Sequence, residues 1–332
     1  MSTSSSREPI AVGVEGSKRS ADALALADLL APLLDRSVLI AFVHSYGDVS
    51  GLLGEGDYQR LVRRVAEETF HDVREHLPSV GEREMRLVGD RSAAAGLHDL
   101  AERANASLLV VGSSHRSRLG RILPGGTAER LLSGAPAPVA VAPAGYAKGK
   151  AQVRTVGCAF DGSPESRHAL EWAAGLARAA SAKLRVIGVH EPLLSASVSI
   201  EGGLPVGSLN EVLRQEQKTE IEEAAAAHSS GLDVSAELLE GDAASVLAQV
   251  SPELDLLVLG SRGYGPVRAV LVGSVSLALM RSAETPIVVT PRGADAPLPG
   301  TRANPRQRDR EDDANGRNAP STEPASGARM GS

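Results

Sequence analysis

The chain has 332 residues, of which 42% are hydrophobic and 2% aromatic, and its formal net charge is −6. This length supports two domains of ordinary size, whose cores must be built from Ala, Leu and Val rather than from aromatic side chains. The negative charge argues against binding to nucleic acid or to an anionic membrane, so the expected binding partner is a small molecule.

The first half of the chain alternates short apolar runs with longer segments of helical period. Residues 20–34 are rich in Ala and Leu, and residues 57–76 mix charged residues with apolar residues at helical spacing. This alternation predicts a parallel sheet covered by helices on both faces. The expected strands are 10–14, 38–43, 84–88, 108–111 and 139–141.

The second half repeats this order of elements. Its expected helices include 166–180 and 210–227, and similar landmarks recur at an offset of 146 to 152 residues. A repeat of this length indicates a duplicated domain rather than a solenoid unit. The expected strands are 155–160, 184–189, 234–239, 256–259 and 287–289.

We therefore expect an α/β protein made of two tandem Rossmann-like domains. Each domain is predicted to have a five-stranded parallel sheet of order 3-2-1-4-5, with helices on both faces. The predicted boundaries are 1–147 and 148–293, followed by a tail, 294–332, that is rich in Pro, Arg, Asp, Asn, Gly and Ser. A tail of this composition buries too little apolar surface to offset its chain entropy, so we expect it to be disordered.

A glycine-rich loop follows the expected strand 256–259 in the second half. A strand that leads through glycines into a helix presents backbone N–H groups at a helix N-terminus, which is a suitable phosphate site. The flanking Arg262 and Arg268 supply positive charge for a phosphate. The loop reads Gly260-Ser261-Arg262-Gly263, followed after nine residues by Gly273-Ser274.

Asp161 ends the first strand of the same half, in the sequence Asp161-Gly162-Ser163. In the expected strand order, strands one and four flank the point where the order reverses, and ligands bind there. Asp161 is suited to accept a hydrogen bond from a ribose hydroxyl or to hold a water molecule of a bound Mg²⁺. A second possibility is that Asp161 caps the helix that follows, although Ser163 and Ser166 can fill that role.

On these motifs, both halves resemble universal stress protein domains, whose pattern is Gly-2x-Gly-9x-Gly-(Ser/Thr). The resemblance covers residues 8–144 and 152–292, and the second half matches the pattern fully. It implies an adenine-nucleotide-binding α/β domain in tandem, with adenine near Ala159, Val189 and Leu259 and with ribose or metal near Asp161. The implied phosphate contacts are Gly260, Gly263, Gly273, Ser274 and Val275.

The first half departs from the family pattern at three positions. Glu15 replaces Asp, His115 replaces the second glycine, and Gly126 replaces the Ser or Thr. The longer Glu15 side chain must retract, and the Cβ of His115 restricts the turn, so we expect weaker ATP binding here or none. The candidate residues of this first site are Glu15, Val43, Gly112, His115, Gly125, Gly126 and Thr127.

The sequence thus predicts a cytoplasmic, ATP-binding regulatory or stress-tolerance protein with an unidentified protein partner. It has neither a signal-peptide core nor an apolar run of about 18 residues. One alternative is a slow ATP-hydrolysing or nucleotide-transfer enzyme, but no catalytic base or Walker lysine stands out in the sequence. The other alternative is an interaction module that binds no nucleotide.

The two halves are expected to pair through their last strands as an intramolecular pseudo-dimer, and a homodimer is a further possibility.

Overall fold

The computed structural model describes most of the first 291 residues. All of these residues fall in one compact unit, Met1–Gly300. The predicted tail, 294–332, lies outside the described residues, and the predicted boundary between the two domains stays a prediction. The described ranges are 8–15, 18–45, 55–76, 83–113, 126–132, 134–149, 152–192, 206–261 and 274–291.

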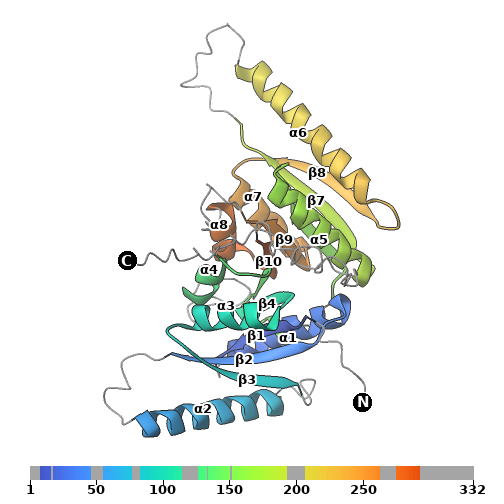
Figure 1. The fold of residues 1–332 in the computed structure, drawn as a ribbon. Coiled ribbons are helices and arrows are strands. Elements are labelled where there is room, and N and C mark those ends of the chain that lie inside the picture. Colours follow the sequence, from blue (N-terminus) through green and yellow to red (C-terminus); the bar gives the residue numbers. More distant parts are fainter. Residues whose placement is uncertain are drawn as a thin grey trace, which may run out of the picture. The chain divides into compact units, whose positions relative to one another are not determined.

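The centre of the fold is one ten-stranded sheet of order β3-β2-β1-β4-β5-β10-β9-β6-β7-β8 (Figure 1). Each half contributes five parallel strands in the predicted order 3-2-1-4-5. The strands of the first half are β1 (Ile10–Val14), β2 (Val38–Ser45), β3 (Glu84–Asp90), β4 (Leu108–Gly112) and β5 (Val139–Ala142). Those of the second are β6 (Thr155–Ala159), β7 (Lys183–His190), β8 (Val234–Glu240), β9 (Leu256–Gly260) and β10 (Ile287–Thr290).

The last strands of the two halves, β5 and β10, pair with each other in antiparallel register. Val288 lies opposite Ala140, and Ile287 lies opposite Val141. Both strands are buried along their whole length, because helices cover both faces of the sheet at this point. The expected pairing of the two last strands is therefore present, and it joins two five-stranded sheets into one.

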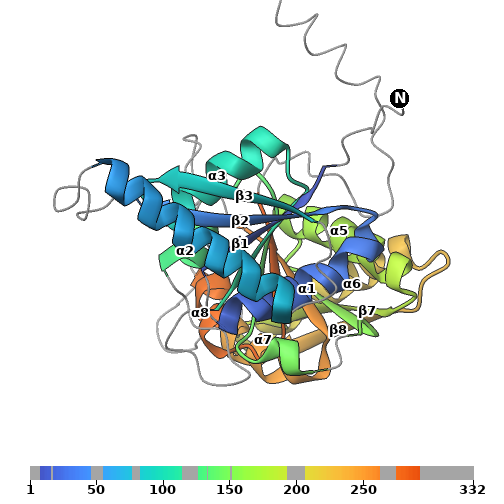
Figure 2. The same ribbon diagram turned by 90° about the horizontal axis from the view of Figure 1, so that it is seen from below.

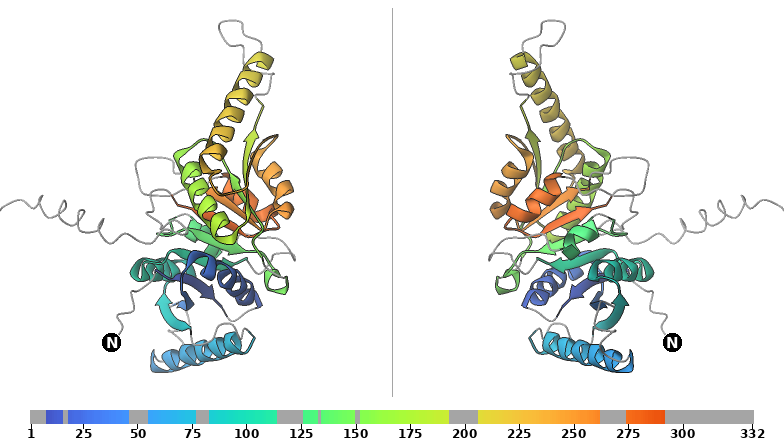
Figure 3. Two further views of the ribbon diagram at one scale, coloured as in Figure 1. Left: turned by 90° about the vertical axis from the view of Figure 1, so that its right-hand side faces the viewer. Right: turned by 90° about the vertical axis from the view of Figure 1, so that its left-hand side faces the viewer.

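One face of the sheet is covered by four helices. The two central helices, α1 (Lys18–Leu34) and α5 (Pro164–Ala180), contact each other across the junction of the halves (Figure 2). The other two, α2 (Glu55–His76) and α6 (Val206–His228), lie over the outer strands at opposite ends of the sheet (Figure 3). The apolar core on this face is continuous and includes Leu26 from the first half and Trp172 from the second.

The opposite face is covered by shorter helices. These are α3 (Ala93–Ala104), α4 (Gly126–Leu132), α7 (Ala243–Val250) and α8 (Ser274–Ser282). Their core is also continuous across the two halves and contains Leu97, Leu131 and Leu279. Neither half therefore closes its hydrophobic core alone.

The connection between the halves is anchored to α1. A short 3₁₀ helix, η2 (Tyr146–Lys148), follows β5, and the buried carboxylate of Asp22 accepts hydrogen bonds from the N–H groups of Gly145 and Ala147, both at 2.9 Å. A second 3₁₀ helix, η3 (Ser251–Glu253), precedes β9.

The sequence-based expectations agree closely with these elements. All ten expected strands are present. Of the four expected helices, α1, α2 and α5 begin two residues earlier than predicted and α6 begins four residues earlier. The helices α3 and α7 were not foreseen. The segments 46–54, between β2 and α2, and 193–205, between β7 and α6, lie outside the described residues. Within the described residues, no helix is long and apolar enough to cross a lipid bilayer.

The pairing of β5 with β10 can be tested by placing a charge in it. Ala140 is fully buried opposite Val288, so Ala140→Asp leaves a carboxylate without a partner and should lower the free energy of unfolding by about 3–5 kcal/mol. Urea denaturation followed by circular dichroism measures this loss. Ala179→Asp, at an exposed position of α5 next to Arg178, should change stability by less than about 1 kcal/mol. An equal effect of the two substitutions would contradict the importance of the junction.

Candidate functional site

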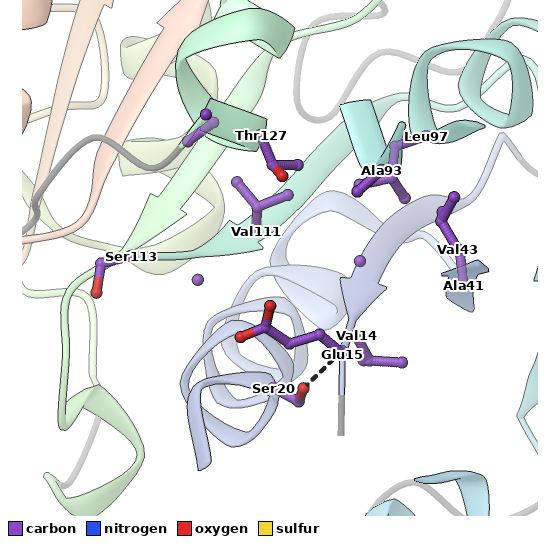
Figure 4. Close-up of a pocket in the computed structure, with 14 residues that line it drawn as sticks. Val14, Glu15, Ser20, Ala41, Val43, Ala93, Leu97, Val111, Ser113 and Thr127 are labelled. Carbon is purple, nitrogen blue, oxygen red and sulfur yellow. Dashed lines mark hydrogen bonds between the residues drawn. The ribbon is translucent and has the colours of Figure 1, made fainter. Parts of the chain in front are cut away.

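A cavity of about 280 Å³ lies in the first half, at the carboxyl ends of β1, β2 and β4 and beside the start of α4. This is the point where the strand order reverses, which is where ligands bind in open α/β sheets. Figure 4 shows Glu15 and Ser20 on one side of the cavity and Thr127 on the other. The predicted first-site residues that line it are Glu15, Val43, Gly112, Gly126 and Thr127.

The chemistry of this cavity is mixed. Val43, Val111 and Leu97 provide an apolar wall, and the side chains of Ser20 and Thr127 provide hydroxyl groups. The backbone N–H of Glu15 donates to Ser20 Oγ at 3.0 Å, which connects the end of β1 to the first turns of α1. An apolar wall facing hydroxyls and one carboxylate suits a ring-bearing ligand with polar groups at one end. The remaining predicted residues, His115 and Gly125, lie outside the described residues.

In the second half, the residues predicted to contact adenine lie together. Leu259 belongs to the apolar core beneath α7 and α8, and Ala159, Val189 and Val275 pack against the same core. They come from the carboxyl ends of β9, β6 and β7 and from the first turn of α8. The second half therefore assembles an apolar surface at the position that corresponds to the cavity of the first half.

Gly260 is required by a close approach between β9 and α5. A Cβ atom at this position would lie 2.6 Å from the carbonyl carbon and oxygen of Glu165 and 2.9 Å from the backbone N of Ser166. These atoms belong to the first turn of α5, so they cannot move aside as a flexible side chain would. Gly260 thus holds the end of β9 against the N-terminus of α5.

Asp161, Gly162 and Ser163 form a turn between β6 and α5. Ser163 is the N-cap of α5, since its Oγ accepts from the N–H of Ser166 at 3.2 Å, and the expectation that a serine fills this role is confirmed. Asp161 is exposed, and its Oδ1 accepts from the N–H of Ser163 at 3.1 Å. Gly162 has a φ of +77°, a left-handed conformation that favours glycine.

Two charged residues absent from the sequence-based prediction hold this turn against α6. Arg167 donates through Nε to the carbonyl of Gly162 at 3.2 Å and forms an ion pair with Glu220 of α6 at 2.5 Å. The guanidinium of Arg167 also lies 5.5 Å from the centre of the Phe160 ring. A ligand that binds at Asp161 would therefore lie next to a contact between α5 and α6.

Cys158, the only cysteine of the chain, is fully buried in β6. Burial raises the pKa of its thiol, and the negative charge of Asp161 raises it further. The thiol is therefore protonated at neutral pH, which agrees with a packing role and not with a nucleophile.

The described residues contain no group of three or more His, Cys, Asp or Glu side chains that could hold a metal ion. Asp161 thus does not belong to a group of three such side chains in this part of the chain. A metal held by protein ligands alone does not fit here. An Mg²⁺ that is held by nucleotide phosphates and reaches Asp161 through water fits the donor set.

The structure also brings to these sites four serines that were not among the predicted binding residues. Ser20 and Ser113 line the cavity of the first half, and Ser166 and Ser261 occupy the corresponding positions of the second half. All four are at most 5% exposed. Their recurrence at offsets of 146 and 148 residues was visible in the sequence and was the signal that could have identified them.

Comparisons with known proteins agree with this arrangement. A family model described as the universal stress protein family matches residues 6–143 and 152–291. Universal stress protein Rv1996 of Mycobacterium tuberculosis is 34% identical over 149 residues, which cover 40% of this chain and 46% of that protein. The chain spans about half the length of the first curated relatives it matches.

A solved structure shows the same fold over most of the chain. A universal stress protein from Archaeoglobus fulgidus covers 86% of this chain and 99% of its own length, with a TM-score of 0.60 and 20% identity. A universal stress protein solved in complex with cAMP covers 42% of this chain and 97% of its own length, with a TM-score of 0.31 and 23% identity.

The close approach at Gly260 leads to a stability prediction. Gly260→Ala should lower the free energy of unfolding by about 1–3 kcal/mol, because the new methyl group overlaps the backbone of Glu165. Gly134→Ala is the control, since a Cβ atom at Gly134 meets nothing within 4 Å. Chemical denaturation measures both variants, and equal stabilities would show that β9 and α5 are not held in close contact.

Proposed function

The chain belongs to the universal stress protein family, and from this premise we propose that it binds ATP in its second half and acts as a nucleotide-responsive regulatory protein. The observation that carries the proposal is that the two sites lie at equivalent positions of the two halves. The first half has a cavity at the carboxyl ends of its strands, and the complete glycine motif of the second half begins at the carboxyl end of β9. A cytoplasmic location stays a prediction from the sequence.

Each part of the nucleotide has a group of residues suited to it in this proposal. The apolar residues Ala159, Val189 and Leu259 take the adenine ring, and Asp161 takes the ribose or a water molecule of Mg²⁺. Phosphate oxygens accept from the N–H groups at the start of α8, at Ser274 and Val275, where the helix dipole favours negative charge. Gly263 and Gly273, which lie outside the described residues, complete the predicted phosphate loop.

Regulation follows from what surrounds the proposed site. The turn at Asp161 is connected to α6 through Arg167 and Glu220, and α8 contacts α7. A ligand that contacts both Asp161 and α8 therefore changes the stability of two helix–helix contacts at the protein surface. The response to ATP is then the exposure of a different surface to a protein partner.

The first half is proposed to bind ATP more weakly than the second. The side chain of Glu15, which lines the cavity of this half, is one methylene longer than that of Asp161. In addition, α4 begins with Gly126, so the hydroxyl that Ser274 supplies at the same position of α8 is missing. The longer side chain takes up space that a ligand needs, and the missing hydroxyl removes a hydrogen-bond donor to phosphate. The first cavity then takes part in binding only at higher ATP concentration.

A matched pair of substitutions tests which half binds ATP. Ser274 and Gly126 are both exposed and both begin a helix, α8 and α4, so tryptophan fits at either position without entering the core. Ser274→Trp blocks the proposed phosphate site and should weaken ATP binding by at least about tenfold, or ~1.4 kcal/mol. Gly126→Trp should leave the tighter binding event unchanged.

Calorimetric titration with ATP, ADP and cAMP measures these affinities, after bound nucleotide has been removed by denaturation and refolding. We expect one tight ATP per chain. The unfolding temperature of each variant without nucleotide shows that it is folded. A larger loss for Gly126→Trp would move the main site to the first half, and no binding by the unmodified protein would refute the proposal.

A further inference from the structure

Ser261 has an unusual environment for a serine. It follows Gly260 directly at the end of β9, is 1% exposed, and its Oγ has no hydrogen-bond partner in the described structure. A buried hydroxyl without a partner is unfavourable, and folded proteins contain few of them. Such a group suggests that a partner from outside the protein completes the hydrogen bond.

The strand fixes the direction of this side chain. The N–H of Ser261 donates to the carbonyl of Thr290 at 2.9 Å, which continues the pairing of β9 with β10. Side chains alternate along a strand, so Ser261 lies on the same face as Leu257 and Leu259, whose core lies beneath α7 and α8. The hydroxyl is therefore on the side of the sheet from which α8 begins.

The internal repeat supports the same orientation. Ser113 holds the corresponding position in the first half, 148 residues earlier, and it lines the cavity together with Gly126 and Thr127. The counterparts of Gly126 and Thr127 are Ser274 and Val275, which open α8. Ser261 therefore lies where its hydroxyl can reach a ligand at the start of α8.

We propose that Ser261 is a ligand-binding residue of the second half, whose Oγ donates a hydrogen bond to a phosphate oxygen of the bound nucleotide. This inference rests on the proposed ATP-binding function. The buried side chain of Ser261 has little room to move and so loses little freedom on binding, and an anionic oxygen is a strong acceptor for its hydroxyl. Ser261 thus adds a side-chain donor to the backbone N–H groups of α8.

Two measurements on Ser261→Ala test this role. Calorimetry should show ATP binding weakened by about tenfold, because one hydrogen bond to a charged acceptor is lost. The unfolding temperature without nucleotide should stay the same or rise, because the substitution removes a buried polar group that has no partner. A hydroxyl with a purely structural role would lower that temperature and leave the affinity unchanged.

Ser251→Ala is the matched control. Ser251 is also fully buried, but its Oγ donates to the carbonyl of Ala248 at 2.8 Å and accepts from the N–H of Glu284 at 3.1 Å. It lies in η3, before the start of β9 and thus at the other end of that strand. Ser251→Ala should lower the unfolding temperature and leave the affinity for ATP unchanged.

Titration with adenosine identifies the acceptor. Ser261→Ala should bind adenosine as the unmodified protein does, because adenosine has no phosphate. Equal weakening for adenosine and ATP would refute the phosphate contact, and so would an unchanged affinity for ATP or a lower unfolding temperature. If the unmodified protein binds no nucleotide, the proposed function itself fails, which is seen before any variant is compared.

Discussion

The antiparallel pairing of β5 with β10 is the interaction on which the rest of the structure depends. Both strands are only four residues long and buried throughout, so either one would be a hydrophobic edge strand if the halves separated. Exposed strands of this kind promote aggregation. Their pairing removes both edges at once, and it allows each apolar core to continue from one half into the other.

The direction of this pairing also decides where the two candidate sites lie. Strands within each half are parallel, but the halves run in opposite directions at the junction. The carboxyl ends of the strands in the first half therefore point in the opposite direction from those in the second half. Each site is formed by its own half, whereas the core that supports both sites is shared.

A duplicated domain can keep its framework while its two sites diverge. The buried serines of the two sites repeat closely: Ser20 corresponds to Ser166, and Ser113 corresponds to Ser261. The exposed positions of the two sites differ, with Glu15 in place of Asp161 and Gly126 in place of Ser274. Shared burial explains why the first set is similar, since packing restricts residue size, while no such restriction applies to exposed Gly126 and Ser274.

Most of the fold and part of the candidate site were predictable from the sequence. The strands were predictable because buried parallel strands appear as short apolar runs, and the glycine motif marked the loop after β9. The short helices α3 and α7 were missed. The contact of Arg167 with Glu220 was also missed, because it joins helices that are 53 residues apart in sequence.

The sequence by itself determined the α/β class, the duplication and the residues that follow the strands. These properties depend on local periodicity and on the spacing of motifs, which follow from the order of residues in the chain without knowledge of tertiary contacts. Only the tertiary structure decided that Gly260 is needed against α5 and that the hydroxyl of Ser261 is buried without a partner. Close approach and hydrogen-bond satisfaction depend on atoms distant in sequence, and these meet only when the chain has folded.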